Sequence, residues 1–138
     1  MLELLSDINL VSRFDVDFDS ETVTAVQGTF IEWDGTLPSA GAIGSNAVWT
    51  ENRGSEWSPD HGATGKVSVL YGKYRAKTSE VGVSTSCAAG TPLYVDAAGK
   101  LTITDAGGSP VAIALGAPVT NYKYLGTDYA KVVEFVTI

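Results

Sequence analysis

Apolar and polar residues alternate along much of this chain, and this pattern constrains its fold more than any other feature. The run Phe14–Asp19 reads F-D-V-D-F-D without a break. A period of two places one set of side chains on a buried face and the other in water, as in a half-buried strand. The same reading predicts further strands at 22–26, 29–33, 66–71, 73–77, 92–95, 101–104, 111–115 and 131–138. Between two of them, Gly72 indicates a bulge or tight bend, and Asp34-Gly35 indicates a hairpin turn.

A helical period is nearly absent from the sequence. Only Leu2–Leu10 is a helical candidate, and it could equally be an extended arm. The chain has 138 residues, of which 44% are hydrophobic and 18% charged, so it is the size of one domain and too apolar to be disordered. We therefore expect an all-β protein: a small compact β-barrel or sandwich-like domain over residues 21–138, with an N-terminal arm over 1–20.

A long Gly/Trp-rich loop region is expected over residues 34–65. Residues 34–47 are rich in Gly, Ala and Ser, and residues 49–65 form a second, turn-rich stretch. The second contains Trp49 and Trp57 in a polar, turn-rich setting. Large aromatic side chains in such a loop either fold back onto the core or contact a partner. Trp49 and Trp57 are therefore candidate partner-contact residues.

Charge is distributed unevenly along the chain. Residues 1–60 carry eleven acidic and two basic side chains, whereas residues 61–138 carry five acidic and seven basic ones. The strand spacing of Lys73, Arg75 and Lys77 places all three on one face. Binding a phosphate backbone needs a larger basic cluster, so we expect a solvated face or a patch that meets acidic neighbours, and no nucleic-acid partner. The longest apolar stretch, 111–119, is too short to span a membrane, and no basic residue precedes Arg13 as a signal peptide would require.

The aspartates at 15, 17 and 19 have the opening spacing of a calcium-binding loop. Such a loop needs glycine at its sixth position and glutamate at its twelfth, where this chain has Ser20 and Val26. A strand whose acidic side chains lie in water explains the same residues, so we expect no metal here.

Catalytic signatures are also lacking. His61 is the only histidine and lies in a turn sequence, and Cys87 is the only cysteine, with no basic neighbour in sequence to activate its thiol. Together they cannot supply a zinc site of the Cys/His type, and no G-x-S-x-G nucleophile elbow occurs. Pairs of carboxylates for glycoside chemistry remain open, because spacing in three dimensions is not visible in the sequence. We expect a protein that is not an enzyme and needs no cofactor or small-molecule substrate.

Residues 88–102 read AAGTPLYVDAAGKLT and are followed by VAIALG at 111–116. Together with a weaker likeness at 63–76, this pattern resembles the small capsid decoration, or cement, proteins of tailed bacteriophages. The resemblance implies a β-rich homotrimer on the outside of the virion, made in the host cytoplasm, that clamps neighbouring major capsid subunits at local threefold positions. The alternative is a tail or fibre-base module that binds a receptor or a sugar. A small hydrolase that uses carboxylates is a third, more distant reading.

The N-terminal arm is the expected capsid-binding segment. Phe14, Val16 and Phe18 would form one apolar edge, so that the strand could add to a sheet of the shell while its side chains fill pockets. In the alternative, this strand belongs to the sheet of the domain itself.

Overall fold

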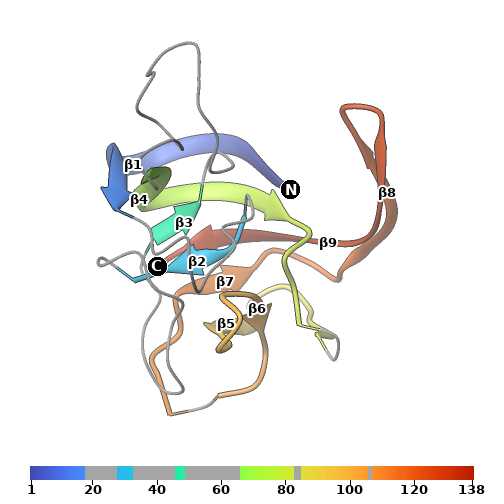
Figure 1. The fold of residues 1–138 in the computed structure, drawn as a ribbon. Helices are drawn as coiled ribbons and strands as arrows, with labels where there is room; N and C mark the ends of the chain where they lie inside the picture. The colour runs from blue at the N-terminus through green and yellow to red at the C-terminus, as the bar shows by residue number, and fades with distance from the viewer. Residues whose placement is uncertain (18–27, 33–45, 49–65, 83–84, 106) are drawn as a thin grey trace.

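The structure is a computed structural model that describes residues 1–17, 28–32, 46–48, 66–82, 85–105 and 107–138. These residues contain strands and no helix, so the expected all-β class is confirmed. The sheet is strongly curled, and one hairpin projects from it (Figure 1). The strands are β1 (Leu2–Asp17), β2 (Phe30–Ile31), β3 (Asn46–Val48), β4 (Lys66–Thr78), β5 (Pro92–Val95), β6 (Leu101–Thr102), β7 (Ala112–Ala114), β8 (Val119–Tyr124) and β9 (Thr127–Thr137).

Strand β4 organises the sheet. Strand β1 pairs with one edge of it along almost its whole length, while β3 and β9 share the other edge. Beyond β9 follow β7, β5 and β6, and β2 extends the sheet beyond β3. All of the strand pairs are antiparallel. Neighbours in the sheet are therefore often far apart in sequence, so the pairing could not be derived from the strand pattern alone.

The first seventeen residues contain a strand rather than the helical candidate of the sequence. Leu2 pairs with Thr78 and Asp17 with Lys66, and Met1 and Leu2 are buried. Pairing with the long strand β4 outweighs the weak helical period of this segment, because tertiary contacts decide marginal propensities. This is the alternative in which the segment belongs to the domain's own sheet. The expected boundary between an arm at 1–20 and a domain at 21–138 falls outside the described residues and stays a prediction.

Strand β4 runs unbroken through the predicted bend. Gly72 has a φ of 122°, a conformation that L side chains rarely adopt, and the register of β1 shifts opposite it, between Leu10 and Ser12. The sequence placed an irregularity at this glycine, and the structure confirms it. Two further register shifts lie nearer the start of β1, between Leu4 and Ser6 and between Asp7 and Asn9.

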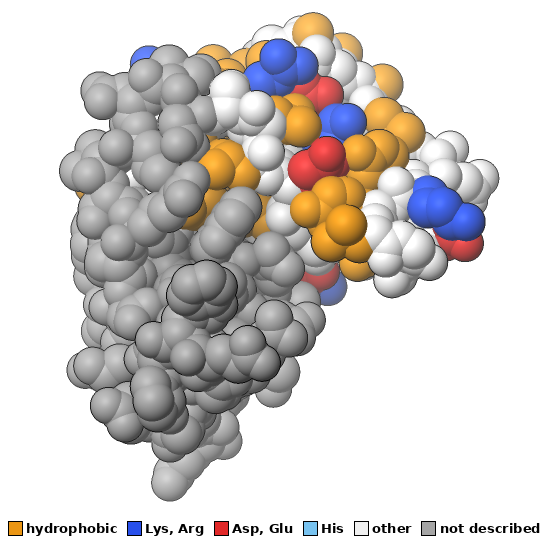
Figure 2. All heavy atoms as spheres, turned by 90° about the horizontal axis from the view of Figure 1, so that it is seen from above, with side chains coloured by type: hydrophobic (Ala, Val, Ile, Leu, Met, Phe, Trp, Pro, Cys, Tyr) orange, Lys and Arg blue, Asp and Glu red, His pale blue; other side chains and the backbone are white. Residues whose placement is uncertain are grey.

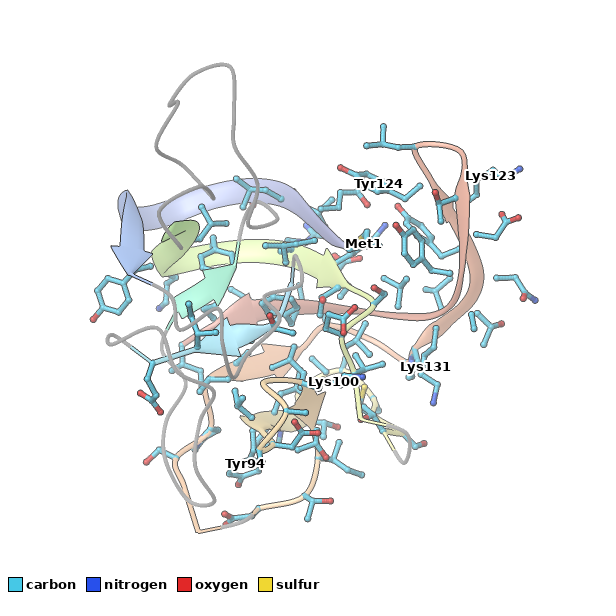
Figure 3. All side chains as sticks on the ribbon, in the orientation of Figure 1. Met1, Tyr94, Lys100, Lys123, Tyr124 and Lys131 are labelled. Atoms are coloured by element: carbon cyan, nitrogen blue, oxygen red, sulfur yellow. The ribbon has the colours of Figure 1, made fainter. Side chains whose placement is uncertain are left out.

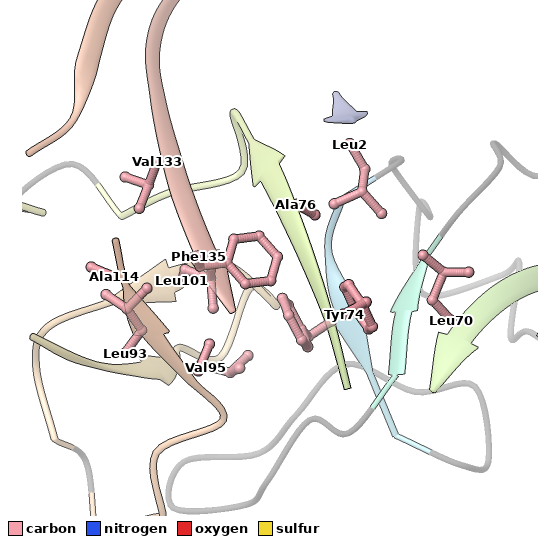
Figure 4. Packing of buried hydrophobic residues seen from close by; sticks show 12 residues of the cluster. Leu2, Leu70, Tyr74, Ala76, Leu93, Val95, Leu101, Ala114, Val133 and Phe135 are labelled. Carbon is pink, nitrogen blue, oxygen red and sulfur yellow. The ribbon is translucent and has the colours of Figure 1, made fainter. Parts of the chain in front are cut away.

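The core lies on one face of the curled sheet (Figure 4). Alternation puts Tyr74 and Ala76 of β4 on this face together with Val133 and Phe135 of β9. The Phe135 ring is central, because its centroid lies 6.1 Å from those of both Phe30 and Tyr74, in tilted and edge-on geometries that aromatic pairs favour.

The segment that carries the resemblance forms β5, β6 and β7, as the strand pattern predicted. Asp96 closes the turn between β5 and β6, since its carboxylate accepts hydrogen bonds from the main-chain N–H groups of Ala98 (2.8 Å) and Lys100 (2.9 Å). Gly99 supplies the positive φ of 75°. Leu93, Val95, Leu101, Ala112 and Ala114 from these strands are buried in the core.

Candidate interaction surface

The structure describes only some of the candidate site residues predicted from the sequence. Phe14 and Val16 lie in β1, where their main chains pair with Val69 and Val67 of β4. Phe18, Trp49 and Trp57 lie outside the described residues, and so does His61. The roles expected for them remain predictions.

Two chemical candidates from the sequence can be placed. Asp15 and Asp17 lie in the extended strand β1, opposite Ser68 and Lys66, and Asp19 lies outside the described residues. Over the described ranges, no three His, Cys, Asp or Glu side chains come together in a group that could hold a metal ion. The same part of the chain has no helix long and apolar enough to cross a membrane.

Cys87 packs against the core. Its Sγ lies 3.5 Å from the carbonyl oxygen of Gly116. Burial raises the pKa of its thiol, and the nearby Lys131 ammonium offsets this only in part. A thiol whose pKa is raised is a poor nucleophile near neutral pH, so the geometry gives Cys87 a packing role.

The face of the sheet opposite the core carries an apolar row. Register places Arg75 of β4, Val136 of β9, Ile113 of β7 and Pro92 of β5 side by side across four strands. The residues on either side of them in each strand are the buried ones, so this row faces outward. Three of its four members are apolar, and each of the three is at least partly exposed.

Two larger apolar side chains flank this row. Leu115, whose main-chain N–H donates to the Glu134 carbonyl oxygen, is 40% exposed, and Ile138 at the end of the chain is 62% exposed. We call the set Pro92, Ile113, Leu115, Val136 and Ile138 the outer apolar face. Figure 2 shows hydrophobic and charged side chains side by side over the described part of the surface. A sheet face of this kind, apolar and rimmed by charge, is typical of a protein contact.

The three basic residues of β4 lie on this outer face, as their spacing predicted. Arg75 pairs with Glu134 through a hydrogen bond of 2.6 Å from its Nε to the carboxylate. Lys77 lies over the Tyr122 ring, 4.7 Å from its centroid. The patch therefore meets acidic and aromatic neighbours within the chain, as the sequence suggested, and Lys73 extends the exposed positive charge beyond Arg75.

A projecting hairpin borders the outer apolar face. It consists of β8 and the first half of β9, joined at Leu125 and Gly126, whose φ angles of 48° and 82° suit the tight turn of a two-residue hairpin. Tyr122 fastens it to the sheet, because its hydroxyl donates to the Glu3 carboxylate at 2.6 Å and accepts from the Lys77 ammonium at 3.3 Å. The bond to Glu3 is the main cause that raises the pKa of this phenol.

A cleft of about 380 Å³ opens between this hairpin and the segment that follows β4. Ser79, Val81 and Gly82 form one wall, and Asp128–Lys131 of β9 form the other. Lys131 spans its floor, since its ammonium donates to the carbonyl oxygen of Thr85 at 3.2 Å. Ser79, Asp128, Tyr129 and Lys131 carry the polar side chains among the residues that line this cleft.

The sequence missed both the hairpin and the outer apolar face. The available signals were the alternation of Thr120, Tyr122 and Tyr124 and the glycine at 126. Comparison of the chain with family models, with curated proteins and with solved structures gives no match.

Proposed function

We propose that this protein is a structural component of a tailed-phage virion that decorates the head and clamps neighbouring major capsid subunits as a homotrimer. Its place is then the capsid exterior, reached from the host cytoplasm during assembly. The proposal begins from the resemblance of residues 88–116, the segment that contains β5, β6 and β7. The fold class agrees with it, since decoration proteins of this kind are β-rich.

The outer apolar face is the observation that carries the proposal. Leu115 and Ile138 present exposed apolar side chains beside Ile113 and Val136, and a contiguous apolar patch on a protein surface is a common site of protein contact. Contact with a flat protein surface would remove this area from water, and each Leu or Ile side chain so buried contributes about 1.5–3 kcal/mol before ordering costs. Arg75 and Lys73 at its rim would favour an acidic border on the shell.

Repetition strengthens such a contact. One modest contact per copy becomes a firm one when several linked copies bind together, because the second and third contacts form at a high effective concentration. A trimer that bridges capsid subunits therefore needs no deep pocket and no chemistry.

The experiment is binding to heads that lack the protein. Leu115→Glu places a charge on the outer apolar face and should reduce occupancy about tenfold or more, since about 1.4 kcal/mol is a factor of ten and an unpaired buried charge costs more than that. Ile103→Glu is the matched control: Ile103 is 37% exposed, close to the 40% of Leu115, and it follows β6 and is not one of the residues that define that face.

Equal occupancy of both variants would contradict the assigned surface. Failure of the wild-type protein to bind heads at all, with binding to tails or to a sugar instead, would favour the tail or fibre-base alternative. Turnover of glycosidase substrates would return the protein to the hydrolases.

A further inference from the structure

The β8–β9 hairpin stands clear of the sheet (Figure 1 and Figure 3). Strand β9 pairs with β4 only from Val133 to Val136, and of the described strands only β8 pairs with its first part, Thr127–Val132. An isolated two-stranded ribbon is marginal in water. The position of this hairpin therefore depends on the contacts that join it to the rest of the chain.

The hairpin leaves the sheet at a bulge. Strand β7 ends opposite Phe135 and β8 begins opposite Val132, so the four residues 115–118 lie opposite only two residues of β9. Extra residues of this kind interrupt the ladder and bend the strand. Gly116 lies among them, and a Cβ added to it would meet no atom within 4 Å apart from its chain neighbours. A small residue in open space between two strands can absorb the dihedral changes of a hinge.

Tyr122 fastens the hairpin to strands β1 and β4. Its hydroxyl donates a hydrogen bond to the Glu3 carboxylate at 2.6 Å and accepts one from the Lys77 ammonium at 3.3 Å. The same ammonium lies 4.7 Å from the centroid of the Tyr122 ring, within the range of a cation–π contact. Lys131 also contacts the rest of the chain, at the Thr85 carbonyl oxygen, but it lies at the base of the hairpin, next to the bulge. Among the described contacts, Tyr122 is therefore the one that holds the part of the hairpin beyond its base.

Glu3 and Lys77 keep a partner when the hairpin moves away from them. They lie opposite each other in the register of β1 and β4, so their side chains emerge from adjacent strands on one face. Opposite charges at such positions attract, and these two groups can pair with each other in place of Tyr122. Release of the tyrosine thus leaves neither charge unpaired, and the cleft of about 380 Å³ beside the hairpin gives space for movement.

We propose that the β8–β9 hairpin is a latched arm, which turns about the bulge at residues 115–118 and which Tyr122 holds against Glu3 and Lys77. In the open position the hairpin moves as a unit, while β4, β7 and the second half of β9 keep their pairing. A latch made of polar contacts near the surface contributes modestly, so the open position is a populated minor state. The arm carries Leu125, which is 86% exposed, and a partner that binds this tip would shift the arm toward the position that suits the partner. The latch does not depend on the proposed function.

Distances between pairs of spin labels, measured by double electron–electron resonance, follow the position of the arm. In a Cys87→Ser background, labels at Thr127→Cys and Ala97→Cys join the end of the hairpin to the β5–β6 turn. Labels at Lys73→Cys and Ala97→Cys lie within the sheet, and all three labelled positions are exposed. The first pair should show one main distance and a smaller second population. Tyr122→Phe should raise that second population about threefold to tenfold and leave the distance within the sheet unchanged.

Tyr124→Phe is the matched control, because Tyr124 lies two residues further along β8 and is half-buried like Tyr122. It should leave both distances unchanged. Glu3→Ala, added to Tyr122→Phe, should open the arm no further, because the hydrogen bond that it removes is already absent. Gly116→Ala, added to Tyr122→Phe, should narrow the range of distances to the end of the hairpin, because alanine has fewer backbone conformations than glycine.

A Tyr122→Phe variant with the wild-type distances would overturn the latch, and so would a Tyr124→Phe variant that opens the arm equally. A changed distance between the labels at positions 73 and 97 would mean that the whole sheet loosens, which contradicts a hairpin that moves alone. If Gly116→Ala has no effect on the distances, the hinge does not lie at the bulge.

Discussion

The Thr137 side chain links β9 to β4 beside Gly72, where the two strands form no regular main-chain pairs. Its hydroxyl accepts a hydrogen bond from the Tyr74 N–H at 2.9 Å and donates one to the Gly72 carbonyl oxygen at 2.8 Å. The regular β4–β9 pairing begins only at Arg75, because the main chain departs from strand geometry at Gly72. The buried hydroxyl therefore replaces the next step of the ladder. Thr137→Val keeps the shape of the side chain and removes both bonds.

The expected cost can be estimated from burial. Tyr74 is fully buried, so its N–H would lose its partner with no water to replace it, at a cost of about 1–3 kcal/mol. Gly72 is partly exposed, and water can satisfy its carbonyl. The methyl group that valine has in place of the hydroxyl is buried, and its burial offsets a fraction of this loss. We expect a net loss of about 2 kcal/mol in the free energy of unfolding, or about 8 °C in the midpoint of thermal unfolding for a chain of this size.

Urea unfolding followed by circular dichroism, at one fixed protein concentration, measures the change. Thr137→Ser is the control, because it keeps the hydroxyl and should lose only about 1 kcal/mol for the missing methyl group. Thr120→Val, at an exposed position of β8, should change stability by less than about 0.5 kcal/mol. A Thr137→Val variant as stable as the wild type, or no more affected than Thr137→Ser, would refute the bridging role.

Three further predictions concern single side chains. The Tyr74 hydroxyl is buried without a hydrogen-bond partner in the described residues, and burial raises the pKa of its phenol; Tyr74→Phe should therefore stabilise the protein by about 1 kcal/mol in urea unfolding, and a loss of stability would reveal a partner. The bond from Tyr122 to Glu3 raises the pKa of the Tyr122 phenol, so this contact is complete below the pH at which tyrosine ordinarily titrates and is lost as the pH rises through the raised pKa. The near-ultraviolet absorbance titration of the wild type minus that of Tyr122→Phe should show the raised pKa. An ordinary or lowered pKa would disprove the contact. Because burial raises the pKa of the Cys87 thiol, alkylation at neutral pH should be slower in the folded protein than in urea, and Cys87→Ser should leave folding intact; equal rates in both states would show an exposed thiol.

The central and C-terminal strands could be predicted from the sequence because they are short runs rich in apolar and β-branched residues. Residues 67–69 and 74–76 of β4 alternate apolar and polar side chains, the segments of β5 and β7 are continuous apolar runs, and Gly72 marked the irregularity in β4. The turn after Val95 was visible in its glycine and aspartate. Local signals of this kind need no knowledge of the partner strand.

The first half of β1 and the whole of β8 could not be predicted in the same way, whereas the second half of β1 begins the predicted strand at Phe14. The first half of β1 reads L-E-L-L-S-D-I-N-L, in which three register shifts disturb the period of two, so its strand character comes from pairing with β4. The turn after β8 uses Leu-Gly, and leucine is not a residue that turn signals include, although both turn residues adopt positive φ.

The outer apolar face depends on register between strands distant in sequence. Ile113, Val136 and Arg75 become neighbours only when β7, β9 and β4 align. A single sequence contains no record of that alignment. The basic face of β4 was predictable because it lies within one strand, whereas the apolar row that crosses four strands was not.

Imaging of phage heads with and without the protein tests the central claim most directly. Heads assembled without it and then incubated with purified wild-type protein should gain density on the outer surface at many symmetric positions, with the outer apolar face against the shell. Heads incubated with Leu115→Glu should remain bare, and heads incubated with Ile103→Glu should be covered. Density confined to the tail, or wild-type heads without added density, would contradict a role in capsid decoration.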